Sequence, residues 1–328
     1  MSFFVRLKKI QDFWNKTRVF FNPNSANYWH KITPCYILEK PNEINRYYLD
    51  FSSKINYAQN FDENRVPLFK YLDEIPETYH PIAISQYALG LYDTLVQSDF
   101  KDDEIKNKFM IQANWLKNNC TIKNGGAFWY FNYPDARYNI QPPWCSAMAQ
   151  GEAVSVLCRA FKLTNNEEYL KSADCALKAF FINVKDGGVI NYFENIILYE
   201  EFPAGEATGV LNGFIFSLFG LYDLILINKN ANAIELFNNG ITAVKKLLPY
   251  YDLGYWSRYD LFRYPLENPA SFTYHSLHVE QLKALYILTG EKIFNDYSGK
   301  WSAYSERLSN RVKALVRKIF YLKKMKAI

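Results

Sequence analysis

A repeating unit of two helices followed by a glycine-aromatic segment constrains the fold of this chain more than any other feature. Apolar residues at helical spacing predict four helix pairs, over 81–96 with 103–118, 144–163 with 167–181, 210–227 with 233–248, and 271–288 with 293–308. Segments that combine glycine with Trp, Tyr or Phe follow the first three pairs. They start at residues 125, 187 and 254, so successive segments are 62 and 67 residues apart.

Helix pairs that recur at such a period stack side by side and bury their shared faces. The sequence therefore predicts a mainly α protein, an incomplete α/α toroid of about four helix pairs with β-hairpins at the end where a cleft forms. A plain helical solenoid without a cleft is the alternative. We expect an N-terminal helix with short strands over 1–75, the toroid over 76–308, and a basic amphipathic helix over 309–328.

The composition is typical of a folded globular protein, with 49 % hydrophobic and 18 % aromatic residues. Most aromatic rings must serve the core, but exposed rings offer flat faces to the apolar side of a sugar. Five cysteines, an odd number without CxxC spacing, argue against a disulfide framework or a zinc site. Such cysteine usage favours a reducing compartment.

The two ends of the chain carry its positive charge. Residues 1–22, predicted to form an amphipathic helix, hold five Lys/Arg and one acid, and residues 307–328 hold eight Lys/Arg and no acid. No secretory signal pattern opens the chain, and the most apolar span, 209–227, contains Asn212 and Asp223, which is typical of a buried helix. We therefore expect a cytoplasmic protein.

The C-terminal helix is predicted to be amphipathic. Its apolar stripe consists of Val312, Leu315, Val316, Ile319 and Phe320. The basic residues that flank the stripe are Arg311, Lys313, Arg317, Lys318 and Lys324. Such a helix can lie on an anionic membrane surface, clamp a polyanionic product, or dock on the domain with its charges solvated. The first alternative predicts peripheral contact with the inner face of the membrane.

Two adjacent glutamates among aromatic residues, in Tyr199-Glu200-Glu201-Phe202-Pro203, are the strongest candidates for chemistry. The proline favours an extended conformation before it, so Glu200 and Glu201 are expected to point in opposite directions. One carboxylate can then face a cleft. Glu201 is the candidate base, provided that burial among the aromatic residues raises its pKa.

Other candidate residues lie near the ends of predicted hairpins and helices. Arg258, Tyr259 and Arg263 share one segment, and arginine suits a forked grip on a carboxylate. The remaining candidates for substrate binding are Trp129, Trp144, Gln150, Glu200, Phe202 and Asn212.

A further segment, Tyr274-His275-Ser276-Leu277-His278, begins a predicted helix. Tyr274 and His278 are four residues apart and share a helix face. A metal site at His275 and His278 would lack a third nearby ligand, so we expect no metal. Both histidines remain candidates for substrate binding.

Six motifs in order, PWCSAMAQGEA, YEEFP, VLNGF, GLYDL, YDL and YHSLH, resemble motifs of the D-glucuronyl C5-epimerases. The resemblance covers about residues 80–305. It implies an α/α toroid that converts D-glucuronate to L-iduronate in a heparosan-like polymer without a cofactor. By resemblance, Glu201 and Tyr274 exchange the C5 proton from opposite faces, and Tyr259 and Arg263 lie near the uronate carboxylate.

Removal of a C5 proton creates a carbanion beside a carboxylate, so the reaction needs three groups. The carboxylate must be neutralised or hydrogen-bonded, a base must lie on one face of the sugar, and an acid on the other. The implied partner is an acidic polysaccharide, with no nucleic acid, and the sequence leaves a homodimer open.

Three alternatives remain. A polysaccharide lyase on the same fold would begin with the same proton abstraction. A glycoside hydrolase would need a second carboxylate paired with Glu201, and the sequence offers none clearly. A non-catalytic polysaccharide-binding protein is suggested by Phe202, which replaces the tyrosine that the resembling family usually carries after its glutamate.

Overall fold

The computed structural model describes residues 17–22, 31, 33–57, 59–70 and 76–325. The helix predicted over 1–22 falls largely outside the described residues, apart from the short 3-10 helix η1 (Arg18–Phe20). The helices of the described toroid are α2 (Pro81–Gln97), α3 (Asp103–Asn118), α4 (Ala147–Thr164), α5 (Glu167–Ala176) with the 3-10 helix η5 (Leu177–Phe181), α6 (Leu211–Asn228), α7 (Ala231–Tyr251), α8 (Phe272–Thr289) and α9 (Lys292–Glu306).

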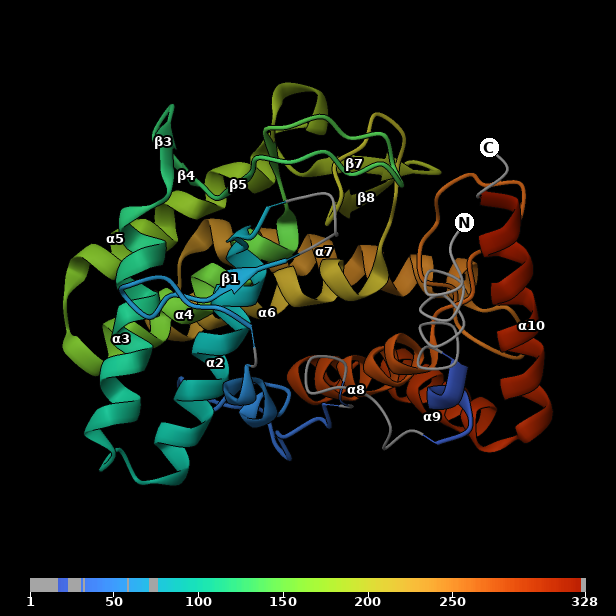
Figure 1. Cartoon of the computed structure of the whole chain (residues 1–328), viewed down its shortest axis with the longest axis horizontal. Helices are drawn as coiled ribbons and strands as arrows, with labels where there is room; N and C mark the ends of the chain where they lie inside the picture. Colours follow the sequence, from blue (N-terminus) through green and yellow to red (C-terminus); the bar gives the residue numbers. More distant parts are fainter. Residues whose placement is uncertain (1–16, 23–30, 32, 58, 71–75, 326–328) are drawn as a thin grey trace, which may run out of the picture.

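These helices form the four predicted pairs, and the incomplete α/α toroid is confirmed (Figure 1). The first helix of each pair packs against the first helix of the next, from α2 through α4 and α6 to α8. Helix α6 is long and apolar enough to cross a membrane, but 78 % of its apolar window is buried inside the protein. It therefore forms part of the core, as its Asn212 and Asp223 led us to expect.

Two glycines allow α4 and α6 to touch along their backbones. A β-carbon on Gly220 would lie 2.0 Å from the carbonyl oxygen of Gly151, and one on Gly151 would lie 2.5 Å from the Cα of Ser217. Neither helix could carry a larger residue at this crossing without moving apart. The two glycines thus set the closest approach between two central helices.

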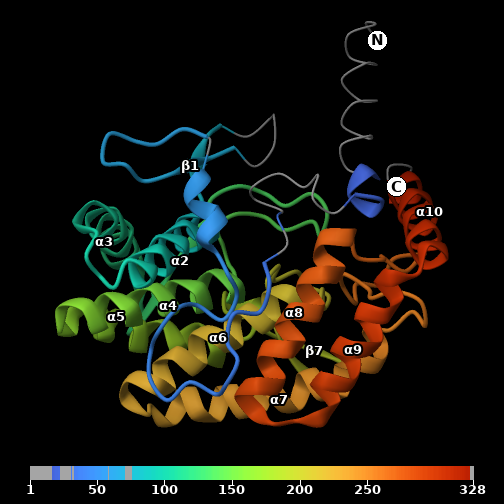
Figure 2. The same ribbon diagram turned by 90° about the horizontal axis from the view of Figure 1, so that it is seen from below.

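The N-terminal segment over 33–57 runs beside α4 and α6 (Figure 2) and forms hydrogen bonds with buried charged side chains of these helices. Arg159 and Asp223 form an ion pair of 2.6 Å in which both side chains are buried. Asp223 also accepts a hydrogen bond from the Tyr48 hydroxyl. Arg159 donates to the carbonyl oxygen of Asn45, so this pair links two central helices to the preceding segment.

Short hairpins gather along one edge of the toroid (Figure 1). Their strands are β3 (Thr121–Lys123) with β4 (Gly126–Phe128), β5 (Tyr130–Phe131) with β6 (Trp144–Cys145), and β7 (Ile190–Phe193) with β8 (Ile196–Tyr199). A separate pair, β1 (Leu68–Phe69) with β2 (Thr78–Tyr79), precedes α2. The turn of β3–β4 is Asn124-Gly125, both at positive φ, as a two-residue hairpin turn of type I′ requires.

The third glycine-aromatic segment does not form the predicted hairpin. Within the described chain, the region after Gly254 has isolated bridges, Asp252 to Ser257 and Arg258 to Pro269, instead of a strand pair. This region forms hydrogen bonds with the segment just before α8 instead: the Trp256 indole N–H, for example, donates to the carbonyl oxygen of Ala270. Such bonds provide partners for buried polar groups without a second strand.

Candidate functional site

Glu201 lies at the start of the loop between β8 and helix α6, and its side chain packs against the first turn of that helix. A β-carbon on Gly213 would lie 2.2 Å from Glu201 Oε2 and 2.5 Å from Glu201 Cβ, so only glycine leaves room for this carboxyl. Asn212 Nδ2 donates to Oε2 over 3.3 Å. The sequence Asn212-Gly213 thus provides both the space and a hydrogen bond for Glu201.

Burial is the main reason that the pKa of Glu201 rises from 4.5 to about 8. The charge of Arg137 and the hydrogen bond from Asn212 lower that pKa, while Asp135 and Glu200 raise it. A carboxyl of this kind is a much stronger base than a free glutamate when it is ionised. The predicted rise in pKa is therefore present.

Tyr274 faces the same region from the first turn of α8. The Ser271 hydroxyl caps this helix by accepting a hydrogen bond from the Tyr274 backbone N–H. The rings of Tyr274 and Tyr259 meet edge to face, with centroids 4.9 Å apart. Burial and the charge of Glu201 raise the Tyr274 pKa to about 12, against the opposing effects of Arg137 and a hydrogen bond with Tyr259. At neutral pH this phenol keeps its proton.

Arg137 is the functional candidate that the sequence reasoning missed. It is exposed and lies on the loop between β5 and β6, with its Cζ 5.9 Å from the centre of the Phe202 ring. Its charge lowers the pKa of both Glu201 and Tyr274. One signal was available, because Arg137 is the only basic residue between 124 and 158.

Aromatic side chains form one wall of this site as a cluster separate from the main core. Phe202 packs against Tyr138 and Trp144 at ring separations of 5.2 and 5.7 Å. The Tyr138 hydroxyl donates to Asp260 Oδ2 over 2.9 Å, which fixes this wall to the residue after Tyr259. The structure thus brings together Glu201, Asn212, Phe202, Trp144, Tyr259 and Tyr274 from the sequence-predicted set.

Glu200 points away from Glu201, in agreement with the expectation from the extended backbone. Its carboxylate accepts hydrogen bonds from the backbone N–H groups of Thr208 and Gly209, at 2.8 and 3.0 Å, and from the Thr208 hydroxyl. It is fully buried. This carboxylate therefore holds the loop before α6, and a substrate cannot reach it in this structure.

Four other predicted residues lie in the core and do not join the group. Gln150 donates to the carbonyl oxygens of Ala127 and Ala176 and accepts from the backbone of Trp129, whose side chain is buried. His275 and His278 are fully buried, and both hydrogen-bond with the Ser257 hydroxyl. These side chains stabilise the junction between helices and loops.

The two predicted arginines interact with acidic side chains other than Glu201. Arg263 is 76 % exposed and comes within 3.9 Å of Glu194 at the tip of the β7–β8 hairpin. Arg258 is partly buried, and its charge lowers the pKa of Asp260. Of the arginines discussed, Arg137 is the one whose charge acts on both members of the pair.

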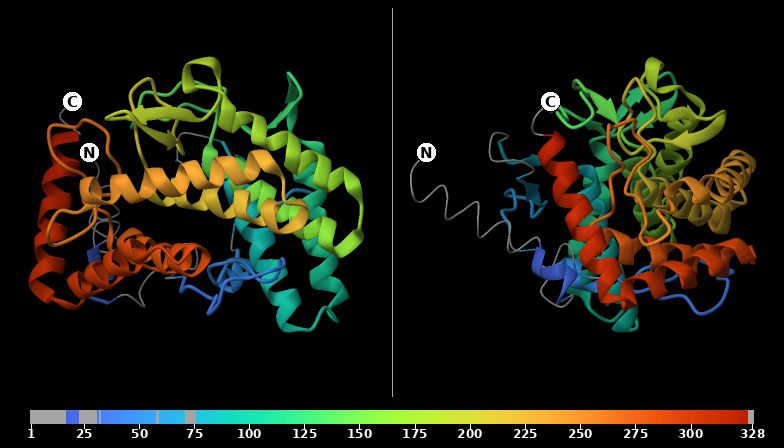
Figure 3. Two further views of the ribbon diagram at one scale, coloured as in Figure 1. Left: turned by 180° about the vertical axis from the view of Figure 1, so that it is seen from behind. Right: turned by 90° about the vertical axis from the view of Figure 1, so that its right-hand side faces the viewer.

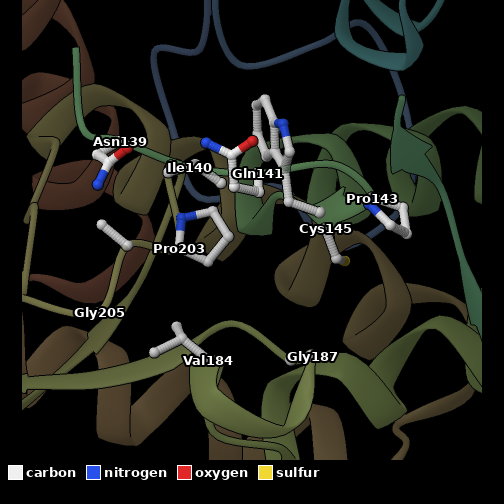
Figure 4. A pocket seen from close by; sticks show the side chains of 12 residues that line it. Asn139, Ile140, Gln141, Pro143, Cys145, Val184, Gly187, Pro203 and Gly205 are labelled. Atoms are coloured by element: carbon white, nitrogen blue, oxygen red, sulfur yellow. The ribbon is translucent and has the colours of Figure 1, made fainter. Parts of the chain in front are cut away.

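A pocket of about 250 Å³ lies beside the aromatic wall (Figure 4). Trp144 belongs to both, since it packs against Phe202 and also lines the pocket. None of the residues that line it is charged: Asn139, Ile140, Gln141, Pro143, Trp144, Cys145, Val184, Gly187, Gly188, Pro203, Ala204 and Gly205. Among the described residues, no group of three His, Cys, Asp or Glu is arranged to hold a metal ion.

Residues 123–303 match the family described as D-glucuronyl C5-epimerase C-terminus. The chain belongs to this family. The matched region contains α4 to α8, most of α9, and all of the site residues Arg137, Glu201, Tyr259 and Tyr274. It excludes α2 and α3 at one end and the helix after α9 at the other.

Relatives of this family member include the D-glucuronyl C5-epimerase of Caenorhabditis elegans, which is 39 % identical over 219 residues. That match covers 62 % of this chain and 36 % of the relative. An uncharacterized protein of Methanocaldococcus jannaschii is 33 % identical over 177 residues, covering 53 % of this chain and 56 % of the relative. The chain thus aligns with about a third and just over half of the lengths of these two proteins.

Among solved structures, the chain is similar to the GH76A alpha-1,6-mannanase from Salegentibacter sp. HEL1_6, with a TM-score of 0.52 and 13 % identity. The similarity covers 78 % of this chain and 68 % of that structure. At this identity the likeness concerns the α/α toroid fold alone.

Proposed function

We propose that this family member inverts C5 of D-glucuronate residues in an acidic, heparosan-like polysaccharide and so produces L-iduronate. The observation that carries the proposal is the meeting of Glu201 and Tyr274 at one site with Arg137 beside them. Glu201 can act as the base, Tyr274 as the acid, and Arg137 can neutralise the sugar carboxylate. The pKa of Glu201, about 8, lies near neutral pH and so suits a general base. The pKa of Tyr274, about 12, keeps its phenol protonated at neutral pH, as a proton donor must be.

In the first step Glu201 removes the C5 proton. The ionised carboxylate forms an O–H bond, and the electron pair of the broken C5–H bond moves into the sugar carboxylate, which becomes an enediolate. Arg137 is exposed and can pair with this carboxylate as its charge grows. Removal of the proton would be unfavourable without such a cation.

In the second step Tyr274 donates its phenolic proton to C5 from the opposite face. The negative charge left on the phenolate is stabilised by Arg137 and by the hydrogen bond with Tyr259, both of which lower the Tyr274 pKa. Glu201 then loses its proton to water and Tyr274 regains one. The reverse reaction uses the two residues in exchanged roles, so solvent hydrogen enters C5 in both directions.

The uncharged pocket beside Phe202 supports a polymer as the substrate. Its volume of about 250 Å³ is below the range of about 300–1,000 Å³ common for drug-sized ligands, so it suits a single sugar unit. Pro143 and Trp144 offer flat apolar surfaces there, while Gln141 offers amide groups. A neutral sugar fits this lining better than a second uronate, which would find no cation.

The test is incubation of a heparosan-like polymer with the protein in deuterated water. Deuterium at C5 together with iduronate would support the epimerase. An unsaturated uronate, detected by its ultraviolet absorbance, would indicate a lyase. Binding without deuterium uptake would indicate a non-catalytic protein. Glu201→Gln and Tyr274→Phe should each lower the exchange rate about 10²–10⁴-fold. Retention of most activity in either variant would overturn the assignment of Glu201 and Tyr274 to opposite faces of the sugar.

A matched control is Glu206→Gln, which changes an exposed glutamate five residues beyond Glu201. This variant should exchange C5 hydrogen at the rate of the unmodified protein. Thermal unfolding of all the variants would show whether each loss of rate occurs in folded protein.

A further inference from the structure

Helix α10 (Leu308–Met325) lies at one end of the molecule (Figures 1 and 3), and its inner face includes the buried residues Ala314 and Tyr321. Ala314 is fully buried, and Tyr321 packs edge to face on Tyr264 at 5.2 Å. Lys318 Nζ donates to Asn268 Oδ1 over 2.5 Å. This inner face explains how the helix is held, but it uses only part of the helix surface.

The outer face of α10 carries an apolar stripe that the described part of the chain leaves exposed. Leu308, Val312, Val316 and Phe320 follow one another at intervals of four residues, so they lie along one side of the helix. Their exposed fractions range from 42 % to 62 %. A contiguous stripe of this kind on a surface marks a place of contact with another apolar phase or partner.

Positive charge borders the stripe. Helix α10 contains six Lys/Arg and no acidic residue. Lys313 and Arg317 each follow a residue of the stripe by one position, and both are exposed, as are Lys323 and Lys324. The occupant of this face must therefore offer apolar volume in the centre and negative charge at the border.

Three occupants of the outer face of α10 can be compared, and one of them offers both apolar volume and negative charge. A free polyanion would pair with the lysines and leave the stripe in water. A second copy of α10 would cover the stripe but would bring two sets of positive charges together. An anionic lipid bilayer has acyl chains beneath a layer of negative headgroups, which complements both features of the helix.

We propose that α10 docks the protein on anionic membrane surfaces, with the stripe of Leu308, Val312, Val316 and Phe320 inserted between headgroups. The inner face then ties the docked helix to the candidate site. Lys318 holds Asn268, and the carbonyl oxygen of Asn268 accepts the backbone N–H of Tyr259. Docking would thus present the site at a fixed orientation to the membrane.

The experiment is flotation of the full chain with vesicles of phosphatidylglycerol and phosphatidylcholine, compared with vesicles of phosphatidylcholine alone. We expect binding to the anionic vesicles only, weakened by salt. Each basic residue near such a surface contributes about fivefold to partitioning, so Lys313→Glu with Arg317→Glu should lower it at least about 25-fold. Phe320→Ser should also lower it, because it removes apolar contact without a change in charge.

The matched control reverses Lys123 and Lys246, two exposed lysines outside α10, to glutamate. This control should float like the unmodified chain, and thermal unfolding should be alike for all the proteins. Equal flotation of the α10 charge variant and the control would overturn the proposal. So would sedimentation that shows a dimer broken by Phe320→Ser, because the stripe would then belong to an interface between copies.

Discussion

The replacement of Gly213 by alanine tests whether the first turn of α6 sets the position of Glu201. An added β-carbon would lie 2.2 Å from Glu201 Oε2, 2.5 Å from its Cβ and 2.8 Å from its Cδ. Carbon atoms in contact are normally about 3.5–4.0 Å apart. Rotation of the carboxyl can relieve the first contact, but the Cβ contact requires a movement of the Glu201 backbone by about 1 Å.

Two effects on stability oppose each other in this variant. Alanine is favoured over glycine inside a helix by up to about 1 kcal/mol. Overpacking of a close contact costs about 1–3 kcal/mol. The free energy of unfolding should therefore fall by about 0–2 kcal/mol, and the protein should remain folded.

The effect on the reaction should be much larger than the effect on the fold. A displacement of about 1 Å in a reacting group costs about 10²-fold in rate. We expect deuterium uptake at C5 to slow by about this factor, measured on folded protein as verified by thermal unfolding. Substrate binding should change little, because Arg137 is on another loop.

Gly299→Ala is the matched control. Gly299 is exposed within α9, and a β-carbon there would meet no atom of the described residues within 4 Å. This variant should gain about 0.4–1 kcal/mol in stability and keep its rate. A Gly213→Ala protein that exchanges C5 hydrogen within twofold of the unmodified rate would refute the argument that this contact positions the base.

Five further predictions concern the site and the buried ion pair. Because Glu201 must be ionised to act as a base, the initial exchange rate at low substrate should rise with pH up to about 8, the value of its pKa. That pKa is raised above its value of 4.5 in the unfolded chain, so the free energy of unfolding should fall as pH rises from about 4.5 to 8, and Glu201→Gln should flatten this part of a chemical-denaturation series. Arg137→Ala should shift the pH–rate profile to higher pH and lower the rate at least about tenfold, with Arg137→Lys restoring part of both, whereas an unchanged profile would remove Arg137 from the site. Phe202→Tyr should fold and exchange at least as fast as the unmodified protein; a loss of about 1–3 kcal/mol in thermal unfolding would show that the pocket leaves the new hydroxyl unsatisfied. Asp223→Ala should cost about 3–5 kcal/mol in urea unfolding, because it leaves the buried Arg159 charge without its partner.

The sequence by itself determined the order and approximate bounds of helices α2 to α10. The helix predicted over 103–118 has those bounds in the structure, and its start is fixed by the side chain of Asp102, which accepts a hydrogen bond from the Ile105 N–H. Such capping and the apolar periodicity are local properties of the chain, so they can be read without knowledge of the fold. The ordered motifs likewise led to Glu201 and Tyr274.

Tertiary structure decided which polar side chains face the site and which support it. Gln150 and His278 are polar residues on inner helices, and whether such a residue meets a substrate or a buried backbone group depends on what packs opposite it. Burial also determines the pKa of Glu201, since its desolvation comes from distant segments. Arg137 reaches the pair only because the β5–β6 loop folds over Phe202, a contact between residues 65 positions apart that no local pattern specifies.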